Sequence, residues 1–427
     1  MSSYRFESSG TRWRLPVAVI VAALAGSVTS GARGEGEEMS YREARDFLVR
    51  HTKVVELGDG NGALVAICPE WQGRVMTSTC GGEDGPSFGF VNRAFIEAGR
   101  LDPRLNNYGA EDRMWLSPEG GPFSLWFKPG AAQTMENWYT PSALNEGPFK
   151  IASASGDPYY RLVRRMKLQN ASNAAFDLDV TRDVRLLSQG DLATLFGEAA
   201  ARTMTGSGVK RVAYETVNTI TNRGEAMARE KGLVSIWALG MLNAAAETVV
   251  IVPYKPGDES QLGPPVKSDY FGPIPPERLK ILPEAILFLG DGEGRGKIGT
   301  SQRRARNVLG SIDFKAGVLT LVHFTMPDDP TQHDYLNNMW GPDQPAPYVV
   351  DVANSYNDGP PEPGQAGLGA FYEIESLSPA VALGTGESLA HHHRTVHLQA
   401  DAATLAQLAN EILGVDLETV RKEMLPR

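Results

Sequence analysis

Residues 371–398 read FYEIESLSPAVALGTGESLAHHHRTVHL, with two glutamates near the start and four of the chain's seven histidines near the end. Side chains alternate between the two faces of a strand, so Glu373 and Glu375 share one face. The middle of the stretch is rich in Pro and Gly, as turns between strands are. The pattern therefore predicts two strands joined by a turn, which is the unit of an antiparallel sheet.

The pairing of these two strands would decide which side chains meet. With a turn centred near Leu383, Glu375 lies opposite His391, and the same register places Glu373 opposite His393. Opposed residues have Cβ atoms ~5 Å apart, which allows contact between a carboxylate and an imidazole. The glutamate charge would raise the pKa of the histidine, and the pair could act as general base and general acid. A polar outer face on an edge hairpin explains the same pattern, and no third ligand for a metal is evident.

Most of the chain outside this stretch is also strand-like. Many short strands separated by turn residues indicate an antiparallel sandwich or barrel rather than a βαβ sheet. Helical spacing is confined to residues 40–51, which begin with a Ser N-cap, and to residues 400–425. The expected fold is thus all-β, a large antiparallel β-supersandwich with a short N-terminal helix and a C-terminal helix. The other expected strands are 64–68, 74–79, 160–168, 175–187, 209–221, 233–239, 248–254, 285–289, 311–314, 318–324 and 348–352.

The N-terminus is typical of an export signal. Arg12 and Arg14 precede the apolar run LPVAVIVAALAGSV, and small residues follow it. The run is shorter than the ~20 residues that a spanning helix needs, so we expect no membrane span in the mature form. The expected organisation is a signal peptide at 1–32, a helical lead-in at 33–53, one β-sandwich domain at 54–399 and a C-terminal helix at 400–427. We expect a periplasmic or secreted protein.

The composition narrows the class of ligand. Hydrophobic residues make up 42% and charged residues 22% of the chain, which is enough for a packed core. A net charge of −10 without a basic patch argues against nucleic acid and favours a neutral or weakly charged ligand. The two cysteines, Cys68 and Cys80, flank a hairpin that turns near Trp71, where Cys68 would lie opposite Arg74. The sequence is compatible with a disulfide between them and with two free thiols.

Residues 106–127, NNYGAEDRMWLSPEGGPFSLWF, hold several groups that suit a sugar. Aromatic faces stack on C–H groups, and planar charged groups bind hydroxyls with two hydrogen bonds. Glu111, Arg113 and Trp115 are therefore candidate binding residues. An Arg–carboxylate pair that ties a loop to the sandwich explains the segment equally well.

Two long loops, residues 255–280 and 339–369, are rich in Pro and Gly but also carry aromatic residues. Loops of this length are usually functional, so we expect them to cover a binding site, with Trp340 and Tyr356 as contacts. The loop Ala353–Pro360 follows Asp351 and holds Asn354, Asn357 and Asp358, whose oxygens could bind calcium. Asn-Asp-Gly is also ordinary turn chemistry, which is the preferred explanation.

The glycine-rich segment GDGEGRGKIGTS, residues 290–301, invites comparison with a phosphate-binding loop. Asp291 stands where that motif needs its first Gly, and Ile298 stands where it needs Ser or Thr. A glycine-rich hairpin is the better interpretation. Lys297 remains a candidate that points into a pocket, and we expect no cofactor and no metal.

Four segments together resemble the galactose mutarotase-like (aldose 1-epimerase-like) superfamily. EWQGRVMTST resembles its opening hairpin, and KGLVSIWALGMLNAAAETVVIVPY is similar to its central strand pair. GAEDRMWLSPEGG resembles a later segment of secreted bacterial members, and FYEIESLSPAVALGTGES resembles the closing hairpin. The resemblance spans residues 54–398 and implies a β-supersandwich with a sugar site in its concave face.

The resemblance also implies catalytic roles. Epimerases of this superfamily use a glutamate base from the closing strand, which corresponds to Glu375, with Glu373 as the alternative. They use a histidine acid from earlier strands, but this chain has no histidine between Cys80 and Val322. His391, His393 or His323 would have to take that role.

The function expected from all of this is that of an exported carbohydrate-binding protein. In its enzymatic form, an aldose 1-epimerase-like isomerase, Glu375 takes the anomeric hydroxyl proton and a histidine protonates the ring oxygen. Two alternatives stay open: a non-catalytic glycan-binding protein, or a glycan hydrolase or lyase that uses Glu373 and Glu375 or Asp112. The expected binding residues are Glu111, Arg113, Trp115, Lys297, Trp340 and Tyr356.

Overall fold

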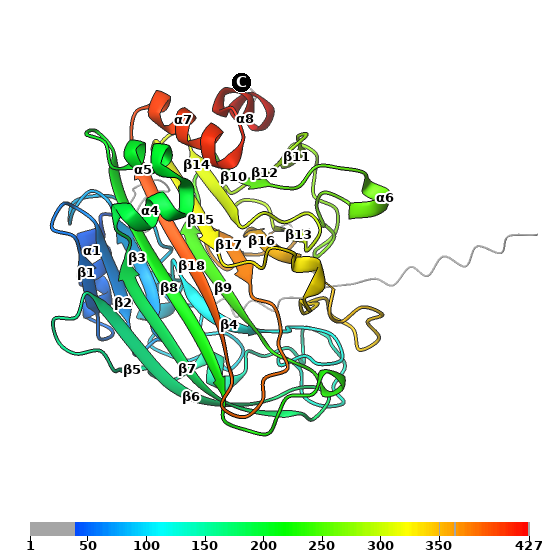
Figure 1. The fold of residues 1–427 in the computed structure, drawn as a ribbon. Helices are drawn as coiled ribbons and strands as arrows, with labels where there is room; N and C mark the ends of the chain where they lie inside the picture. Colours follow the sequence, from blue (N-terminus) through cyan, green and yellow to red (C-terminus); the bar gives the residue numbers. More distant parts are fainter. Residues whose placement is uncertain (1–38, 350, 363, 426–427) are drawn as a thin grey trace, which may run out of the picture.

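The computed structural model describes residues 39–349, 351–362 and 364–425. The described chain forms a three-stranded, a ten-stranded and a five-stranded sheet, and every pairing between named strands is antiparallel (Figure 1). The antiparallel all-β fold predicted from the sequence is confirmed. The expected signal peptide at 1–32 lies outside the described residues.

The ten-stranded sheet is built mainly from the longest strands of the chain. Among these, β6 and β7 alternate buried with more exposed positions over much of their length, as expected for strands with one face on a core. In spatial order the strands are β11 (Leu279–Ile281), β12 (Ala285–Leu289), β10 (Thr248–Pro253), β14 (Val308–Asp313), β15 (Val318–Phe324), β18 (Ser388–Gln399), β8 (Lys210–Asn222), β7 (Ala175–Leu186), β6 (Tyr159–Gln169) and β5 (Lys150–Ile151).

The five-stranded sheet is buried on both faces. Almost every residue of its central strands is buried, so their burial pattern is continuous rather than alternating. Its order is β13 (Gly296–Ser301), β16 (Asp351–Asn357), β17 (Phe371–Leu377), β9 (Ser235–Asn243) and β4 (Arg113–Ser117). The three-stranded sheet holds β1 (Val55–Gly58), β2 (Leu64–Cys68) and β3 (Arg74–Thr79).

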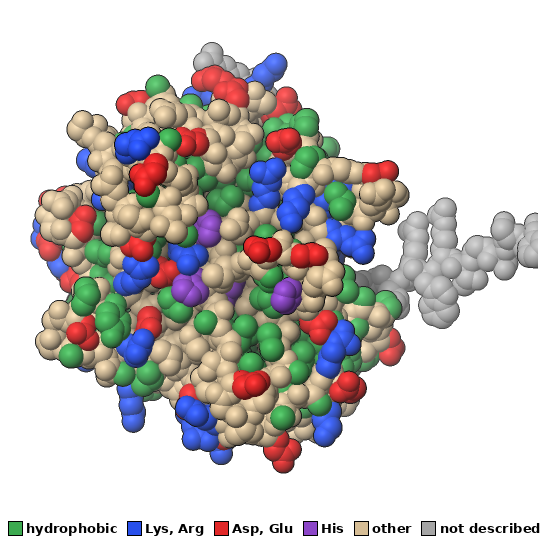
Figure 2. Space-filling model, viewed as in Figure 1, with side chains coloured by type: hydrophobic (Ala, Val, Ile, Leu, Met, Phe, Trp, Pro, Cys, Tyr) green, Lys and Arg blue, Asp and Glu red, His purple; other side chains and the backbone are tan. Residues whose placement is uncertain are grey.

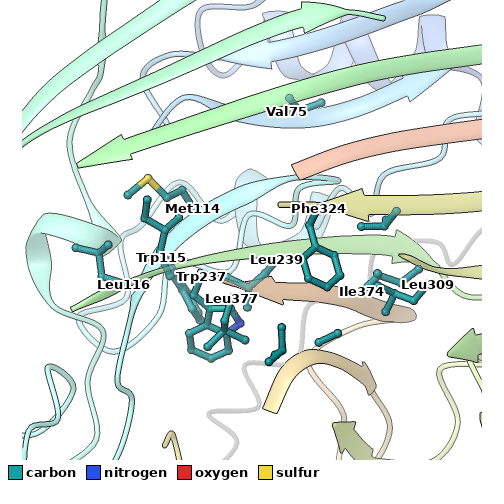
Figure 3. Close-up of a cluster of buried hydrophobic side chains, with 14 of the residues drawn as sticks. Val75, Met114, Trp115, Leu116, Trp237, Leu239, Leu309, Phe324, Ile374 and Leu377 are labelled. Atoms are coloured by element: carbon teal, nitrogen blue, oxygen red, sulfur yellow. The ribbon is translucent and has the colours of Figure 1, made fainter. Parts of the chain in front are cut away.

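The two larger sheets pack face to face. The hydroxyl oxygens of Tyr372 on β17 and Ser311 on β14 are 2.7 Å apart, which joins one sheet to the other. The main core lies in this interface and contains Phe324 and Leu309 from the large sheet and Ile374 from β17 (Figure 3). Burial of such side chains stabilises the sandwich by roughly 1.5–3 kcal/mol each.

Helices cover only part of the sandwich. The upper outer face of the ten-stranded sheet is covered by four helices, which share a second core with β8, β10, β15 and β18 (Figure 1). None of the described helices is long and apolar enough to cross a membrane. The helices are α1 (Tyr41–Val49), α2 (Arg93–Glu97), α3 (Ser142–Asn145), α4 (Gln189–Phe196), α5 (Glu198–Met204), α6 (Glu259–Leu262), α7 (Ala402–Leu413) and α8 (Leu417–Met424), with 3-10 turns η1 (Arg229–Lys231) and η2 (Pro330–Gln332).

Local signals explain the helix boundaries. Ser40 caps α1 in a capping box with Glu43, as its position before the helical pattern predicts. The C-terminal helix is two helices rather than one, because Gly414 adopts a left-handed conformation (φ 69°) that ends α7. The hairpin near Trp71 has the predicted register, with Cys68 opposite Arg74. Both cysteines are free and buried.

The predicted hairpin of residues 371–398 is wrong. β17 pairs with β9 and β16 in the five-stranded sheet, whereas β18 pairs with β8 and β15 in the ten-stranded sheet. The connection between them crosses from one sheet to the other. The glycine-rich segment before β13 is likewise a crossover, since β12 and β13 belong to different sheets. Asn354 and Asn357 lie on β16 and not in a turn.

Candidate functional site

The outer face of the five-stranded sheet carries a cluster of charged side chains. Glu373 and Glu375 share this face of β17, because Ser376 next to them points to the opposite face, which meets the large sheet. Arg113 of β4 shares the outer face, since Arg113 and Glu375 both pair with Leu239 of β9. We call Arg113, Glu119, Lys297, Glu373 and Glu375 the outer cluster.

Glu375 is fully buried and is held by side chains from β9, the neighbouring strand, and from β13, two strands away. The Lys297 ammonium donates to both of its oxygens, at 2.9 and 2.8 Å, and Trp237 Nε1 donates to Oε2 at 2.9 Å. Lys297 also lies over the Trp237 ring, 4.9 Å from its centroid. Burial alone would lower the pKa of Lys297, but the charge and hydrogen bonds of Glu375 outweigh it and the pKa is raised. Glu375 is therefore oriented by a cation and an indole.

Glu373 is the second carboxyl group of the outer cluster. Arg113 Nη2 donates to its Oε1 at 2.7 Å, and the guanidinium lies 4.1 Å from the centroid of the Trp115 ring. Burial, partly offset by Arg113, and the neighbouring Glu375 raise the pKa of Glu373 to about 7. A carboxyl group in this state can hold or release a proton near neutral pH.

Glu119 brings a third carboxyl group from the loop after β4. Its Oε1 accepts from Trp138 Nε1 at 2.9 Å and from Trp340 Nε1 at 3.1 Å. Burial raises the pKa of Glu119, although Lys297 opposes the shift. Two loops far apart in the sequence therefore meet above the outer cluster.

The loop of residues 255–280 adds a contact between a hydroxyl and a fourth acid. The Tyr270 hydroxyl donates to Asp351 at the start of β16, and its ring centroid is 5.7 Å from Lys297 Nζ. Burial raises the pKa of Asp351. On the same strand Tyr356 donates to Asp358 at 2.6 Å. The outer face is thus walled by aromatic rings.

The structure brings together most of the predicted site residues. The predicted loops do cover this face, because Trp340 and Tyr270 reach the outer cluster from them. Tyr356 on β16 lies between its pairing partners Lys297 on β13 and Glu373 on β17. The predicted residues that gather here are Arg113, Trp115, Lys297, Trp340, Tyr356, Glu373 and Glu375.

The predicted pairing of glutamates with histidines is wrong. Among the described residues, no imidazole contacts Glu373 or Glu375. His391 Nε2 and His393 Nδ1 instead lie 2.8 and 2.9 Å from the Ser376 hydroxyl, between the two sheets. Burial lowers the pKa of both histidines, the opposite of the predicted direction. The cause is the crossover after β17, which sends the two strands to different sheets.

His323 is separated from the outer cluster as well. It lies on the outer face of the ten-stranded sheet, where Arg394 Nη1 is 3.2 Å from its Nδ1 and Asn307 Nδ2 is 3.0 Å from its Nε2. Burial and then Arg394 lower the pKa of His323 to about 4. Figure 2 views this face and shows histidines near its middle, beside Lys and Arg side chains.

Glu111 and Asp112 also point away from the outer cluster. Glu111 accepts from Ser78 at 2.6 Å and lies 3.0 Å from His397 Nε2, and Asp112 pairs with Arg182. All of these groups are buried between the sheets. We call Glu111, Asp112, Arg182 and His397 the inner cluster. The structure therefore does not support Glu111 as a binding residue or Asp112 as a working carboxylate.

Several residues of the site were missed by the sequence reasoning. Glu119 belongs to the segment 106–127 that suits a sugar, next to Arg113 and Trp115, but it was not chosen as a candidate residue. Trp237 sits in an unbroken apolar run, and nothing local distinguishes it from a core residue. Tyr270 and Asp351 are far apart in sequence, so only the fold reveals their contact.

A groove of about 410 Å³ lies elsewhere, on the ten-stranded sheet at β5–β8. Its lining includes Arg165 and Arg223, which are paired with Asp177 and Asp179 at 2.7 and 2.6 Å. These two ion pairs account for Arg165, Arg223 and Asp179 among the charged residues of the groove. It lacks the aromatic walls and raised carboxyl pKa values of the outer cluster, so we place the candidate site at the outer cluster. Within the described residues, no group of three or more His, Cys, Asp or Glu could hold a metal ion.

Fold and site together define an all-β sandwich with a buried acid–base cluster on the outer face of its smaller sheet. The chain belongs to a family of unknown function, DUF6786, whose model matches residues 39–424. No curated protein matches it.

Among solved structures, the chain is similar to two proteins named "putative aldose 1-epimerase". The one from Escherichia coli K12 has 12% identity and a TM-score of 0.47, over 82% of this chain and 99% of that chain. The one from Klebsiella pneumoniae has 12% identity and a TM-score of 0.46, over 83% and 81%. The Slr1438 protein of Synechocystis sp. PCC 6803 has 10% identity and a TM-score of 0.44, over 82% and 96%. Two of these proteins bear the name of the superfamily that the sequence motifs resemble.

Proposed function

We propose that this protein binds a sugar on the outer face of the five-stranded sheet and interconverts its anomers. The proposal depends on one observation: Glu373 and Glu375 lie on the same face of β17 and have different hydrogen-bond partners. Glu375 accepts from Lys297 and Trp237, whereas Glu373 has a pKa of about 7. Neighbouring aromatic rings supply faces on which the C–H groups of a sugar can stack.

The proposed reaction uses both carboxyl groups on the same substrate. An oxygen of Glu375 takes the proton of the anomeric hydroxyl while Glu373 gives its proton to the ring oxygen. The bond between the anomeric carbon and the ring oxygen breaks, and the electron pair of the hydroxyl oxygen forms the carbonyl. Rotation of the carbonyl and the reverse transfers then give the other anomer. The two oxygens are bonded to one carbon, which suits carboxyl groups on one face of one strand.

This mechanism replaces the histidine acid expected from the sequence. A general acid works best when its pKa lies near the working pH, and Glu373 meets that condition. His391 and His393 fail it on position and on pKa, because both are buried between the sheets. The aldose-epimerase resemblance and the site geometry therefore support the same reaction class with a different acid.

The test combines binding and polarimetry on the purified protein. Freshly dissolved α-anomers of common aldoses and uronic acids would be followed by optical rotation, and binding by titration calorimetry. We expect acceleration by the wild type and a loss of ~100-fold or more in Glu375→Gln, the size of effect of removing a general base. Lys53→Gln, an exposed change on the connection before β1, is the matched control.

The outcomes separate the proposed reaction from its alternatives. Binding without acceleration of any anomer would leave a non-catalytic glycan-binding protein. Release of shorter products from polysaccharides would instead favour a hydrolase, for which Glu119 is the additional carboxyl group with a raised pKa. Absence of both binding and turnover across the panel would rule out the sugar site. We further propose that the protein acts in the periplasm or outside the cell.

A further inference from the structure

The rim of the outer cluster has an exposed aromatic ring. Phe271, on the loop of residues 255–280, is 47% exposed, and its ring centroid is 5.9 Å from that of Tyr356. The loop is fixed to the sheet at this point, because Lys267 and Gly299 of β13 exchange two backbone hydrogen bonds of 2.9 Å. An exposed phenyl ring that is held in place beside a site is a ready surface for a ligand.

Arg295 lies against this ring without an acidic partner. Its guanidinium carbon is 4.1 Å from the centroid of Phe271, and it stands two residues before Lys297. Within residues 39–349, 351–362 and 364–425, its side chain makes no ion pair and no hydrogen bond, and its Nε is buried and unpaired. By contrast, both terminal nitrogens of Arg278, from the same part of the molecule, donate to Asp291. Arg295 therefore offers an unpaired guanidinium group beside the site.

Lys267 is a second cation on the same rim. Its ammonium lies 4.6 Å from the centroid of the Tyr270 ring, and it forms no ion pair with a described residue. The buried acids nearby are engaged elsewhere: Asp351 accepts from Tyr270, and Asp358 accepts from Tyr356. Asp269 and Glu293, which are close in sequence to Tyr270 and Arg295, are exposed and form no ion pair with a described residue.

We propose that the substrate of this site is an acidic sugar, whose carboxylate binds Arg295 while a sugar ring lies against Phe271. The inference rests on the proposed sugar site and adds the class of sugar. A guanidinium binds a carboxylate with two parallel hydrogen bonds, and stacking on a ring orients it beforehand. Leaving a buried N–H unpaired costs free energy, which a bound carboxylate returns. The net charge of the chain alone suggests a neutral ligand. The cations beside the site, Arg295 and Lys267, are much closer to a bound ligand than most of the chain's charges, so they determine which ligand charge is favoured.

The experiment compares acidic and neutral sugars of matched shape. Titration calorimetry would measure glucuronate and galacturonate against glucose and galactose, for the wild type and for Arg295→Gln. We expect the wild type to bind one uronate at least tenfold more tightly than its neutral counterpart. We expect Arg295→Gln to lose that preference while the affinity for the neutral sugar changes less than threefold. Arg295→Lys should recover part of it, because an ammonium keeps the charge without the fork.

A matched control is Arg202→Gln, which removes an exposed arginine of α5, away from the five-stranded sheet. It should leave both affinities unchanged, and melting curves of all variants report whether they are folded. Equal affinity for uronates and neutral sugars in the wild type overturns the acidic-sugar inference and leaves the sugar site standing. The acidic-sugar inference is also overturned if Arg295→Gln retains the preference. If no sugar of either kind binds, the proposed function itself is overturned.

Discussion

Asp112 and Arg113 are consecutive residues, yet they belong to two different clusters of buried charge. Asp112 points between the sheets into the inner cluster, and Arg113 points to the outer face into the outer cluster. Strand alternation explains the opposite directions. The comparison of the two clusters shows which buried charges serve the fold and which are available for chemistry.

Within the inner cluster, the ion pair of Arg182 and Asp112 has its hydrogen-bonding groups occupied by neighbouring residues. All three nitrogens of the Arg182 guanidinium donate, to the Gly73 carbonyl, to Asn218 and to Asp112, and Thr216 donates to the second oxygen of Asp112. Arg182 and Asp112 are fully buried. Nothing of this pair is left to bind a ligand, so its role is to fix the position of the two sheets relative to each other.

The outer cluster differs from the inner cluster in what lies over it and in having a carboxyl group that titrates near neutral pH. Loops rather than a second sheet lie over it, and Lys297, Glu373 and Arg113 keep 12%, 8% and 6% of their side chains exposed. Glu373 titrates near neutral pH. Buried ion pairs alone are weak evidence of function, and it is this combination that distinguishes the outer cluster.

The largest expected effect is on stability, from breaking the inner cluster. Arg182→Leu leaves the Asp112 carboxylate buried without its cation, which costs ~3–5 kcal/mol of the free energy of unfolding. Urea denaturation followed by tryptophan fluorescence measures it. The double variant Arg182→Leu with Asp112→Leu should lose less, since both charges are removed together. A single-variant loss below ~1 kcal/mol would contradict the structural role of this pair.

The next effect concerns activity and comes from the outer cluster. Lys297→Met leaves Glu375 with the Trp237 indole as its donor, so its carboxylate is no longer oriented. We expect the rate of anomer interconversion to fall ~100-fold, as misplaced catalytic groups do. Polarimetry and urea unfolding on the same samples separate loss of activity from loss of fold. Retention of activity within ~3-fold would remove Lys297 from the mechanism.

A pH dependence follows from Glu373. Its pKa rises from 4.5 to about 7 on folding, so between these values the folded state binds more protons than the unfolded state. The contribution of Glu373 to the free energy of unfolding therefore falls as pH rises through this window. Glu373→Gln should make the pH profile of stability flatter between pH 4.5 and 7. The rate should fall above pH 7 in the wild type, because the acid loses its proton.

One result for the pH profile of stability would contradict the role given to Glu373. If stability of Glu373→Gln follows the same slope as the wild type, another group titrates there. Glu111→Gln in the inner cluster is the matched comparison, because it removes a buried carboxylate that does not touch the proposed substrate.

The smallest effect is expected at the loop contact. Trp340→Phe removes one of the two indole donors of Glu119 while Trp138 keeps the other. The loss of one hydrogen bond costs about 0.5–1.5 kcal/mol, and less where a loop can relax, so we expect only a small change in stability. We expect a few-fold weaker sugar binding by calorimetry with an unchanged melting temperature. A large drop in melting temperature would mean that this loop supports the fold and not the ligand.

Much of the fold could be predicted from local pattern. The strand 371–377 was predicted with the bounds of β17, and 318–324 with those of β15, because turn residues bracket both. β4 and β13 were missed, since five or six residues with Gly or Arg and no alternation give no strand signal. The helices α4 and α5 were missed as well, being short and rich in small residues.

The candidate site could be predicted only in part. Arg113, Trp115 and Trp340 follow from residue type in segments that suit sugars, and they do meet at one face. The partner of Glu375 could not be predicted. Lys297 is 78 residues away in sequence and two strands away in the sheet, and such contacts depend on which strands pair.

The shared direction of Glu373 and Glu375 could be read from the amino-acid order, because the alternation of side chains along a strand is a property of the local backbone. Local sequence also sets where α1 begins, because Ser40 and Glu43 form a capping box there. That Glu375 contacts a lysine instead of a histidine depends on how the strands are arranged in the folded chain. The physical reason is that strand pairing is non-local: the segment after β17 can close a hairpin or cross to the other sheet, and burial of both sheets' inner faces selects the crossing.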